Sequence, residues 1–269
     1  MHNHGAAAFS RSHKEWKGIV SKMYRFFVDP SQIHGTDIRI TGSDVNHIQH
    51  VLRMKPGEEI AVSNGVDGKE YRCGIEEFLD GEVRCTLRFI KEDGVELPSH
   101  IYLFQGLPKA DKMELIVQKC VELGVFEIIP VATKRAVVKL DEKKARSKTE
   151  RWQGIAEAAA KQSKRGIIPQ VTMPVSFAEA VKRASSMDLR LIPYEMAEDG
   201  MSLTRELIES ARPGMDIAVF IGPEGGFEQE EINLALENDI RPITLGKRIL
   251  RTETAGLAVL SWLMYQLED

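Results

Sequence analysis

Apolar and polar residues alternate along the first part of the chain, in the manner of half-buried β-strands. Ile38 and Ile40 alternate with polar neighbours, and every second residue over 83–89 is apolar. Two further strands are expected at 59–63 and 70–79, because Asn-Gly and Asp-Gly turn dipeptides lie between them. This spacing of short strands predicts a small β-rich domain.

One helix is expected to interrupt these strands. Ser43 is a good N-cap residue, and Val45, Ile48, Val51 and Leu52 recur at helical spacing behind it. The sequence therefore predicts a helix that Ser43 caps.

After turn residues at 93–98, short apolar segments alternate with segments of helical period. Strands are expected at 101–105, 126–132, 189–193, 216–222 and 243–245, and helices at 113–123, 150–164, 203–211, 228–238 and 252–267. Gly124 is expected to end the first of these helices as a left-handed cap. Strands that alternate with such helices predict a mostly parallel sheet with helices on both faces.

Ligands bind such sheets beyond the carboxyl ends of the strands. Four loops are therefore of interest: Gly106–Asp111, Tyr194–Glu195, Gly222–Phe227 and Gly246–Thr252. The third contains three glycines, which permit positive φ angles and close approach of the backbone to a ligand. A tight turn without a ligand is the alternative interpretation. The chain lacks the GxGxxG motif that a nicotinamide-dependent dehydrogenase would need.

The stretch 245–254 combines apolar, basic, hydroxyl and acidic residues directly before the last helix. Thr252 or Thr254 is expected to cap that helix. Capping does not account for Arg251 and Glu253, which lie in a loop at the edge where ligands bind. These two residues are therefore candidates for chemistry.

Composition indicates a globular protein without a membrane span. Hydrophobic residues make up 43% and charged residues 28% of the chain, and no apolar stretch approaches the ~18 residues of a membrane helix. Three cysteines lie far apart, which favours a reducing compartment, expected to be the cytoplasm. His47 and His50 have no third ligand nearby, so no metal site is expected.

Residues 1–22 differ from the rest of the chain. They are polar, include three histidines and lack the continuous apolar region of a signal peptide. Met23 precedes an apolar run and is the natural start. The extension is therefore expected to be disordered or non-native.

A basic stretch lies at 134–148, where seven basic residues accompany only Asp141 and Glu142. On its own, such a stretch is typical of a solvated connection. The net charge of −4 argues weakly against a protein coated in positive charge for nucleic acid. A polyanion-binding surface becomes credible where other features point to RNA.

Five stretches of the chain resemble one protein family. They are HIQHVLRMKPGE, QGLPKADKMELIVQKCVELGV, RWQGIAEAAAKQSKR, FIGPEGGFEQEEI and LGKRILRTETAGLAVL. Together they are similar to the ribosomal RNA small-subunit methyltransferase E family, part of the SPOUT superfamily of knotted methyltransferases. The resemblance runs from Met23 to the C-terminus, and the last two motifs are highly specific in combination.

The resemblance implies a PUA-like RNA-binding β-barrel at 23–95 and an α/β trefoil-knot methyltransferase domain at 97–269. True knots are rare, and no periodicity of the sequence would predict one. The resemblance also implies a homodimer, S-adenosylmethionine as cofactor, and methylation of N3 of one uridine in 16S rRNA, within the small ribosomal subunit.

The same resemblance implies the residues of the site. The cofactor-binding residues are Ile192, Pro193, Tyr194, Ile221, Gly222, Pro223, Glu224, Gly225, Gly226, Leu245, Gly246, Ile249, Leu250 and Arg251. The RNA-binding residues are Arg25, Arg53, Lys112 and Arg165, and the catalytic residues are Arg251 and Glu253.

The expected chemistry needs a group that takes the proton from uracil N3 and a cation that stabilises the resulting anion. Glu253 and Glu224 are both candidates for the base, although Glu224 is rather expected to hold a backbone amide or an arginine. Two other functions stay open: a SPOUT methyltransferase acting on tRNA or 23S rRNA, and an inactive RNA-binding assembly factor.

Overall fold

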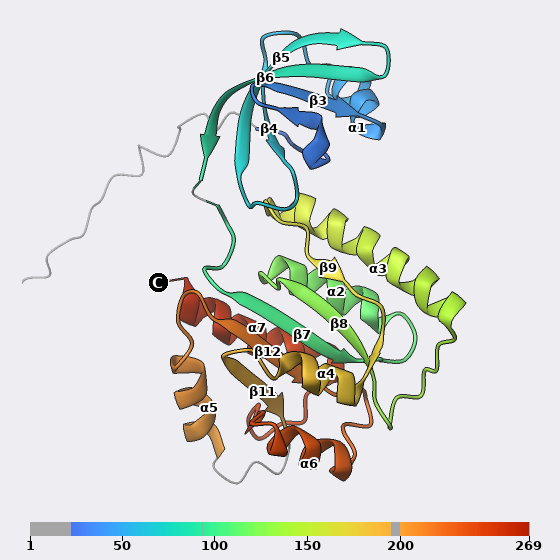
Figure 1. The fold of residues 1–269 in the computed structure, drawn as a ribbon, viewed down its shortest axis with the longest axis vertical. Coiled ribbons are helices and arrows are strands. Elements are labelled where there is room, and N and C mark those ends of the chain that lie inside the picture. Colours follow the sequence, from blue (N-terminus) through green and yellow to red (C-terminus); the bar gives the residue numbers. More distant parts are fainter. Residues whose placement is uncertain (1–22, 93, 195–199, 269) are drawn as a thin grey trace, which may run out of the picture.

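The computed structural model describes residues 23–92, 94–194 and 200–268, and it shows two bodies joined by a short connection (Figure 1). The expected extension at 1–22 lies outside the described residues. The first body is a sheet with the strand order β1-β4-β5-β6-β3-β2, in which only β1 and β4 pair in parallel. Its elements are β1 (Arg25–Phe27), η1 (Pro30–Gln32), β2 (Ile33–His34), β3 (Asp37–Thr41), α1 (Ser43–Asn46), η2 (His47–Val51), β4 (Glu59–Ser63), β5 (Glu70–Leu79) and β6 (Glu82–Lys91).

The strands expected at 59–63 and 70–79 are confirmed. The expected helix begins differently, because Gly42 is its N-cap at φ +77° and Ser43 is already its first residue. From His47 the helix continues as a π-helix, which changes its period. Ile48 is therefore buried, whereas Val51 is 62% exposed.

The second body is a parallel sheet, as the alternation of strands and helices predicts. Its strand order is β10-β8-β7-β12-β11-β13, and β9 pairs with the outer side of β8. The strands are β7 (His100–Gly106), β8 (Glu127–Ala132), β9 (Gln170–Val171), β10 (Val175–Ser176), β11 (Leu189–Pro193), β12 (Asp216–Ile221) and β13 (Arg241–Ile243). The helices are α2 (Lys112–Glu122), α3 (Glu142–Ser163), α4 (Phe177–Ala184), α5 (Gly200–Glu209), α6 (Gln229–Glu237) and α7 (Thr252–Leu267).

Helices cover both faces of this sheet. Residues of α2, α3, α5 and α7 share one apolar core, and residues of α4 and α6 share another. Successive side chains of β12 point to opposite faces, so Val219 belongs to the first core and Phe220 to the second. No helix among the described residues is both long and apolar enough to cross a membrane.

Several elements of this body differ from the prediction: α5 spans Gly200–Glu209 instead of 203–211, and β13 spans Arg241–Ile243 instead of 243–245. Helix α3 begins at Glu142 instead of 150. Its first turns are charged and bury little besides Ala145, so no apolar period marks them as helical in the sequence. Helix α4 was not expected, although Ser176 and Glu179 form a capping box before it. Gly124 has φ +88°, so its predicted left-handed conformation is confirmed.

Candidate functional site

The loops that follow β7, β11, β12 and β13 gather at the carboxyl edge of the parallel sheet. The amide of Tyr194 donates to the carbonyl oxygen of Ile243 over 2.9 Å. The hydroxyl of Thr252 donates to the carbonyl oxygen of Gly222 over 2.7 Å. The loops at 222–227 and 246–252 therefore contact each other, and the end of β11 contacts the end of β13. Glu195 lies outside the described residues.

The glycine-rich loop after β12 packs closely against the end of β7. A Cβ atom on Gly106 would lie 2.6 Å from Cδ of Pro223, so only glycine permits this approach. Gly226 has φ +69°, and its amide donates to the Pro223 carbonyl oxygen over 2.9 Å. The loop is compact and rich in exposed backbone, which suits close approach of a ligand.

A residue from a distant part of the sequence holds this loop in place. Arg135 donates from Nη1 to the carbonyl oxygen of Gly225 over 3.0 Å, and its Nε lies 2.9 Å from Glu228. The amide of neighbouring Lys134 donates to the buried carboxylate of Glu231. The start of the basic stretch therefore supports the loop instead of forming a solvated connection.

Lys112, Glu224 and Glu253 form a charge cluster beside the glycine-rich loop. The Lys112 ammonium lies 2.9 Å from Oε1 of Glu224 and 3.3 Å from Oε2 of Glu253. The carboxylate of Glu224 also accepts the backbone amide of Lys109 at 3.1 Å. Glu224 thus holds a backbone amide, as one of the two interpretations of its role expects.

The pKa values in the charge cluster follow from these contacts. Burial raises the pKa of Glu224, but hydrogen bonds from Lys112 and from backbone amides outweigh burial, and the pKa falls below its ordinary value. The hydrogen bond to Glu224 is the main cause that raises the pKa of Lys112. Glu224 is therefore a carboxylate and Lys112 an ammonium at neutral pH.

The loop between β13 and α7 is open to solvent. Gly246 has φ +95°, and a Cβ atom added to it would meet nothing within 4 Å. Ile249 is 84% exposed, whereas Leu250 packs partly against the core. The Arg251 side chain is 79% exposed, with Nη1 3.9 Å from Oε1 of Glu253. The two residues expected to carry chemistry are thus neighbours in space, but Glu253 lies in the first turn of α7 and not in the loop as predicted.

Gln105 is a site residue that the sequence did not single out. It is fully buried at the end of β7, and its Nε2 donates to the Thr252 hydroxyl and to the Gly106 carbonyl oxygen, both over 2.9 Å. Because Thr252 in turn donates to Gly222, this chain of hydrogen bonds joins β7, the glycine-rich loop and α7. A glutamine that ends an otherwise apolar strand is the signal that could have identified it.

The residues expected to contact RNA occupy different environments. Arg53 is exposed at φ +54° and has no ion pair within the part of the chain that the structure describes. Lys112 belongs to the charge cluster. Arg25 pairs with Glu70 and donates to the carbonyl oxygen of Lys164, so it lies between the two bodies.

Arg165 requires a correction. It is only 3% exposed, so the expected contact with RNA does not fit its position. Its Nη1 donates to the carbonyl oxygens of Val121, over 3.1 Å, and Val125, over 2.6 Å. Its Nη2 lies 2.6 Å from Glu96. Arg165 therefore joins segments of the protein interior.

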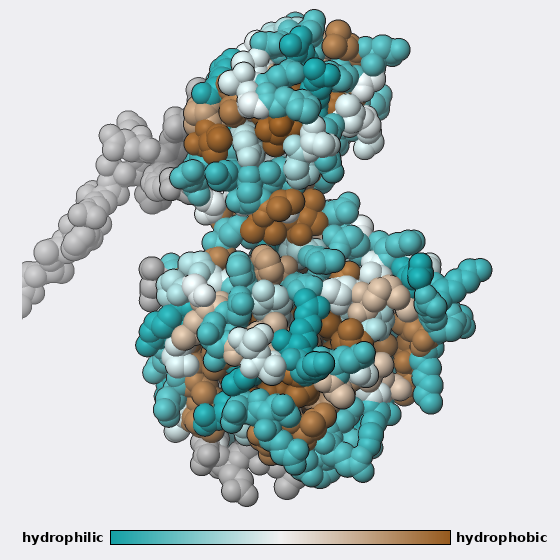
Figure 2. All heavy atoms as spheres, viewed as in Figure 1, coloured by the Kyte–Doolittle hydropathy of each residue, from teal (hydrophilic) through white to brown (hydrophobic). Residues whose placement is uncertain are grey.

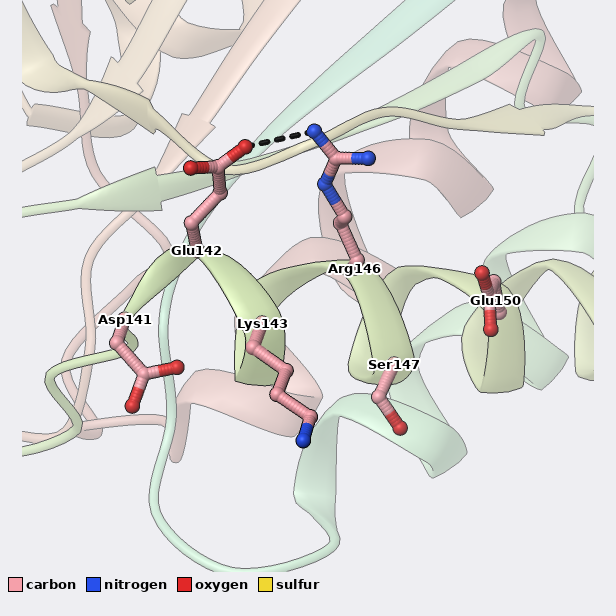
Figure 3. Close-up of a pocket in the computed structure, with 6 residues that line it drawn as sticks. All are labelled: Asp141, Glu142, Lys143, Arg146, Ser147 and Glu150. Atoms are coloured by element: carbon pink, nitrogen blue, oxygen red, sulfur yellow. Dashed lines mark hydrogen bonds and ion pairs between the residues drawn. The ribbon is translucent and has the colours of Figure 1, made fainter.

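A shallow hollow on the exposed face of α3 lies away from these loops (Figure 3). Its lining is charged and comes from the first turns of one helix, where Glu142 pairs with Arg146 at 2.6 Å. No other loop of the described chain contributes to its lining, so the sheet edge, where several loops meet, is the better candidate site.

Comparison with known families agrees with this architecture. A model of an RNA methyltransferase domain matches residues 95–264, and a model of an RNA methyltransferase PUA domain matches residues 40–94. Fold and site together therefore define the class of RNA methyltransferases that carry an N-terminal PUA domain. The ribosomal RNA small subunit methyltransferase E of Bacillus subtilis (strain 168) is 38% identical over 251 residues, which cover 91% of this chain and 98% of that protein. The chain belongs to the ribosomal RNA small subunit methyltransferase E family.

Two solved structures have the same fold. Ribosomal RNA small subunit methyltransferase E from Neisseria gonorrhoeae, bound to S-adenosyl methionine, is 31% identical, with a TM-score of 0.76 over 89% of this chain and 95% of that one. A methyltransferase from Legionella pneumophila, in complex with the same cofactor, is 33% identical, with a TM-score of 0.76 over 91% of this chain and 98% of that one.

Proposed function

We propose that this protein transfers a methyl group from S-adenosylmethionine to N3 of one uridine in 16S rRNA. The observation that carries the proposal is the charge cluster of Lys112, Glu224 and Glu253, which lies beside glycine-rich loops in a chain of this family. In this proposal, the carboxylates of Glu224 and Glu253 and the ammonium of Lys112 would lie beside the bound cofactor and the target nucleobase.

The loops fit such a cofactor. Cβ atoms added to Gly226 or Gly246 would meet nothing within 4 Å, so a ligand can approach the backbone at both positions. Leu245 and Leu250 pack only partly against the core and leave apolar surface for an adenine ring. The residues proposed to hold the cofactor are Ile192, Pro193, Tyr194, Ile221, Gly222, Pro223, Glu224, Gly225, Gly226, Leu245, Gly246, Ile249, Leu250 and Arg251.

The side chains of the site divide the remaining work. S-adenosylmethionine supplies a methyl group on a cationic sulfur, which is already strongly electrophilic. The exposed guanidinium of Arg251 would stabilise negative charge on the uracil oxygens. Glu253 would accept the N3 proton, and Lys112 would hold its carboxylate in position. Glu224, which binds the Lys109 amide, supports the arrangement.

The RNA and the assembly complete the proposal. Arg53 and Lys112 would contact RNA phosphate or the target uridine. Arg25 would do so only after its contacts with Glu70 and Lys164 open. The proposed substrate is the assembled small ribosomal subunit in the cytoplasm. The trefoil knot and the homodimer that the family resemblance implies belong to the same proposal. Helix α7 supports a dimer, because it is apolar on most sides yet leaves Tyr265 80% exposed.

A strain without the gene tests this function. Its 16S rRNA is expected to lack 3-methyluridine in nucleoside mass analysis and to regain it on complementation. Loss of a methylated nucleoside from tRNA or 23S rRNA instead would indicate another RNA substrate. Normal methylation with defective subunit assembly would indicate an inactive RNA-binding factor.

A further inference from the structure

The contact between the two bodies is built around residues 164–168, which follow α3. The amide of Ile168 donates to the carbonyl oxygen of Gly65 over 2.9 Å, and Gly65 forms a parallel bridge with Ile167. A Cβ atom on Gly166 would lie 2.5 Å from the carbonyl oxygen of Gly68. The backbones of the two bodies are thus in direct contact, and glycine is needed at 166 for this approach.

The connection between the bodies is fastened to the same segment. Both carboxylate oxygens of Glu96 are used: one accepts the amides of Gly166 and Ile167, at 2.9 and 3.1 Å, and the other pairs with Arg165. Arg165 also binds the carbonyl oxygens at the end of α2. Arg165 is buried, so removal of the Glu96 carboxylate would leave its guanidinium without its charged partner.

Helix α3 links this contact to the site. Figure 1 shows its C-terminal end beneath the β-rich body and its N-terminal end farther from that body, and Figure 2 shows apolar side chains where the two bodies meet. The helix has 22 residues, which corresponds to roughly 33 Å. The loop before it carries Arg135, which binds Gly225 in the glycine-rich loop.

We propose that Glu96 and residues 164–168 form a rigid joint, which sets the distance between the β-rich domain and the methyl-transfer site. The inference rests on the proposed function, since it takes folded rRNA as the substrate. Such an enzyme binds RNA that presents two contact regions at the matching separation, and a rigid link makes the second contact effectively intramolecular. Glu96 is then a positioning residue for the RNA.

Glu96→Ala and Glu96→Gln in the full-length protein test the joint. If the freed domain holds its productive orientation about one tenth of the time, the Kd and KM for small ribosomal subunits rise about tenfold in Glu96→Ala. Glu96→Gln keeps an oxygen for the two amides and should lose less, on the order of threefold. The kcat at saturating subunits and the affinity for S-adenosylmethionine should stay within about twofold.

Glu114→Ala is the matched control, because it also removes a carboxylate that pairs with an arginine, Arg151 on α3, at 2.8 Å. Unchanged subunit affinity in Glu96→Ala would overturn the proposed role of the joint, and so would an equal loss of subunit affinity in Glu114→Ala. A parallel loss of cofactor affinity would make Glu96 a structural residue only. If the wild type binds subunits but forms no 3-methyluridine, the proposed function fails. The subunit affinities of the wild type and Glu96→Ala would still show whether the joint positions the RNA.

Hydrogen exchange measures the rigidity directly. The amides of Gly166 and Ile167 are expected to be protected in the wild type and to exchange at least about tenfold faster in Glu96→Ala, because their acceptor is lost. Rapid exchange of these amides in the wild type would contradict a rigid joint.

Discussion

Among single residues, Lys112 has the central position in the proposed site. It lies between two carboxylates that come from different segments, and one of them is the proposed base. Without a cation, Glu224 and Glu253 would repel each other, and the position of Glu253 against the target nitrogen would be lost.

Lys112→Met is therefore expected to lower kcat at least about tenfold, in keeping with the value of a positioned base. The affinity for S-adenosylmethionine should change less than about threefold, because the glycine-rich loops remain. Steady-state kinetics and calorimetric titration measure both quantities. Lys119→Met, on the same helix and paired with Glu122 at 2.9 Å, is the control; an equal effect in both variants would refute the role of Lys112.

The contribution of the Lys112–Glu224 ion pair to stability depends on pH. The pKa of Glu224 is lowered in the folded state, so the stability from its pairing is present above its unfolded pKa and is lost as the pH falls through the folded value. The difference in Tm between wild type and Lys112→Met should therefore shrink from about pH 7 to about pH 3. A difference that stays constant over this range would show that the pairing does not contribute.

Gly225→Val is expected to abolish cofactor binding while the protein stays folded. A Cβ atom at this position would lie 3.2 Å from Cβ of Arg135, so the larger side chain must displace the arginine that holds the loop. Gly154→Ala on α3, where an added Cβ meets nothing within 4 Å, is the control. Titration with the cofactor and circular dichroism check both variants; normal affinity in Gly225→Val would contradict the site.

Arg53→Ala is expected to weaken RNA binding with cofactor affinity intact, because Arg53 is exposed and unpaired within the described residues. Loss of one phosphate contact should also reduce the salt dependence of binding by about one unit of slope. Filter binding over a range of salt concentrations measures this. Arg39→Ala, in the same domain but engaged with Asp37, is the control, and a selective cofactor defect in Arg53→Ala would disprove the prediction.

At the scale of elements, strong local patterns predicted the fold well. The strand at 189–193 and the strands at 59–63 and 70–79 agree with the alternation and turn signals. The start of α3 could not be predicted from apolar period, because charged residues dominate its first turns. The eight residues of α4 are too few to show a clear helical period.

The candidate site was predictable only in part. The loops at the strand ends could be predicted, since parallel strands bring their carboxyl ends to one edge. The contacts of Lys112 with Glu224 and Glu253 could not be predicted. The three residues belong to segments far apart in sequence, and the order of the strands in the sheet decides that these segments are neighbours. The interior position of Arg165 likewise depends on tertiary packing, which a local basic pattern does not reveal.

Thr252 illustrates how an element is fixed to the site. The sequence predicts Thr252 or Thr254 as the cap of α7, but Arg251 is the N-cap residue, and the Thr252 hydroxyl joins Gln105 to Gly222 instead. Thr252→Val should destabilise the protein by about 1–3 kcal/mol, because buried polar groups lose their partner. Exposed Thr254→Val should cost less than about 0.5 kcal/mol. Urea unfolding measures both, and equal costs would contradict the buried network.

In the molecule as a whole, the proposed function needs both bodies but not residues 1–22. The family models match from residue 40 to 264, and the β-rich sheet begins at Arg25. Removal of residues 1–22 should therefore leave kcat/KM for methyl transfer unchanged within about twofold. A large loss of activity in the shortened protein would show that residues 1–22 contribute to methyl transfer.

The proposed methyl transfer is tested most directly by incubation of the purified protein with methyl-labelled S-adenosylmethionine and small ribosomal subunits that lack this modification. Label is expected in 16S rRNA, recovered as 3-methyluridine in nucleoside mass analysis. Label in another nucleoside, or no transfer to RNA although the cofactor binds, would contradict the proposed function.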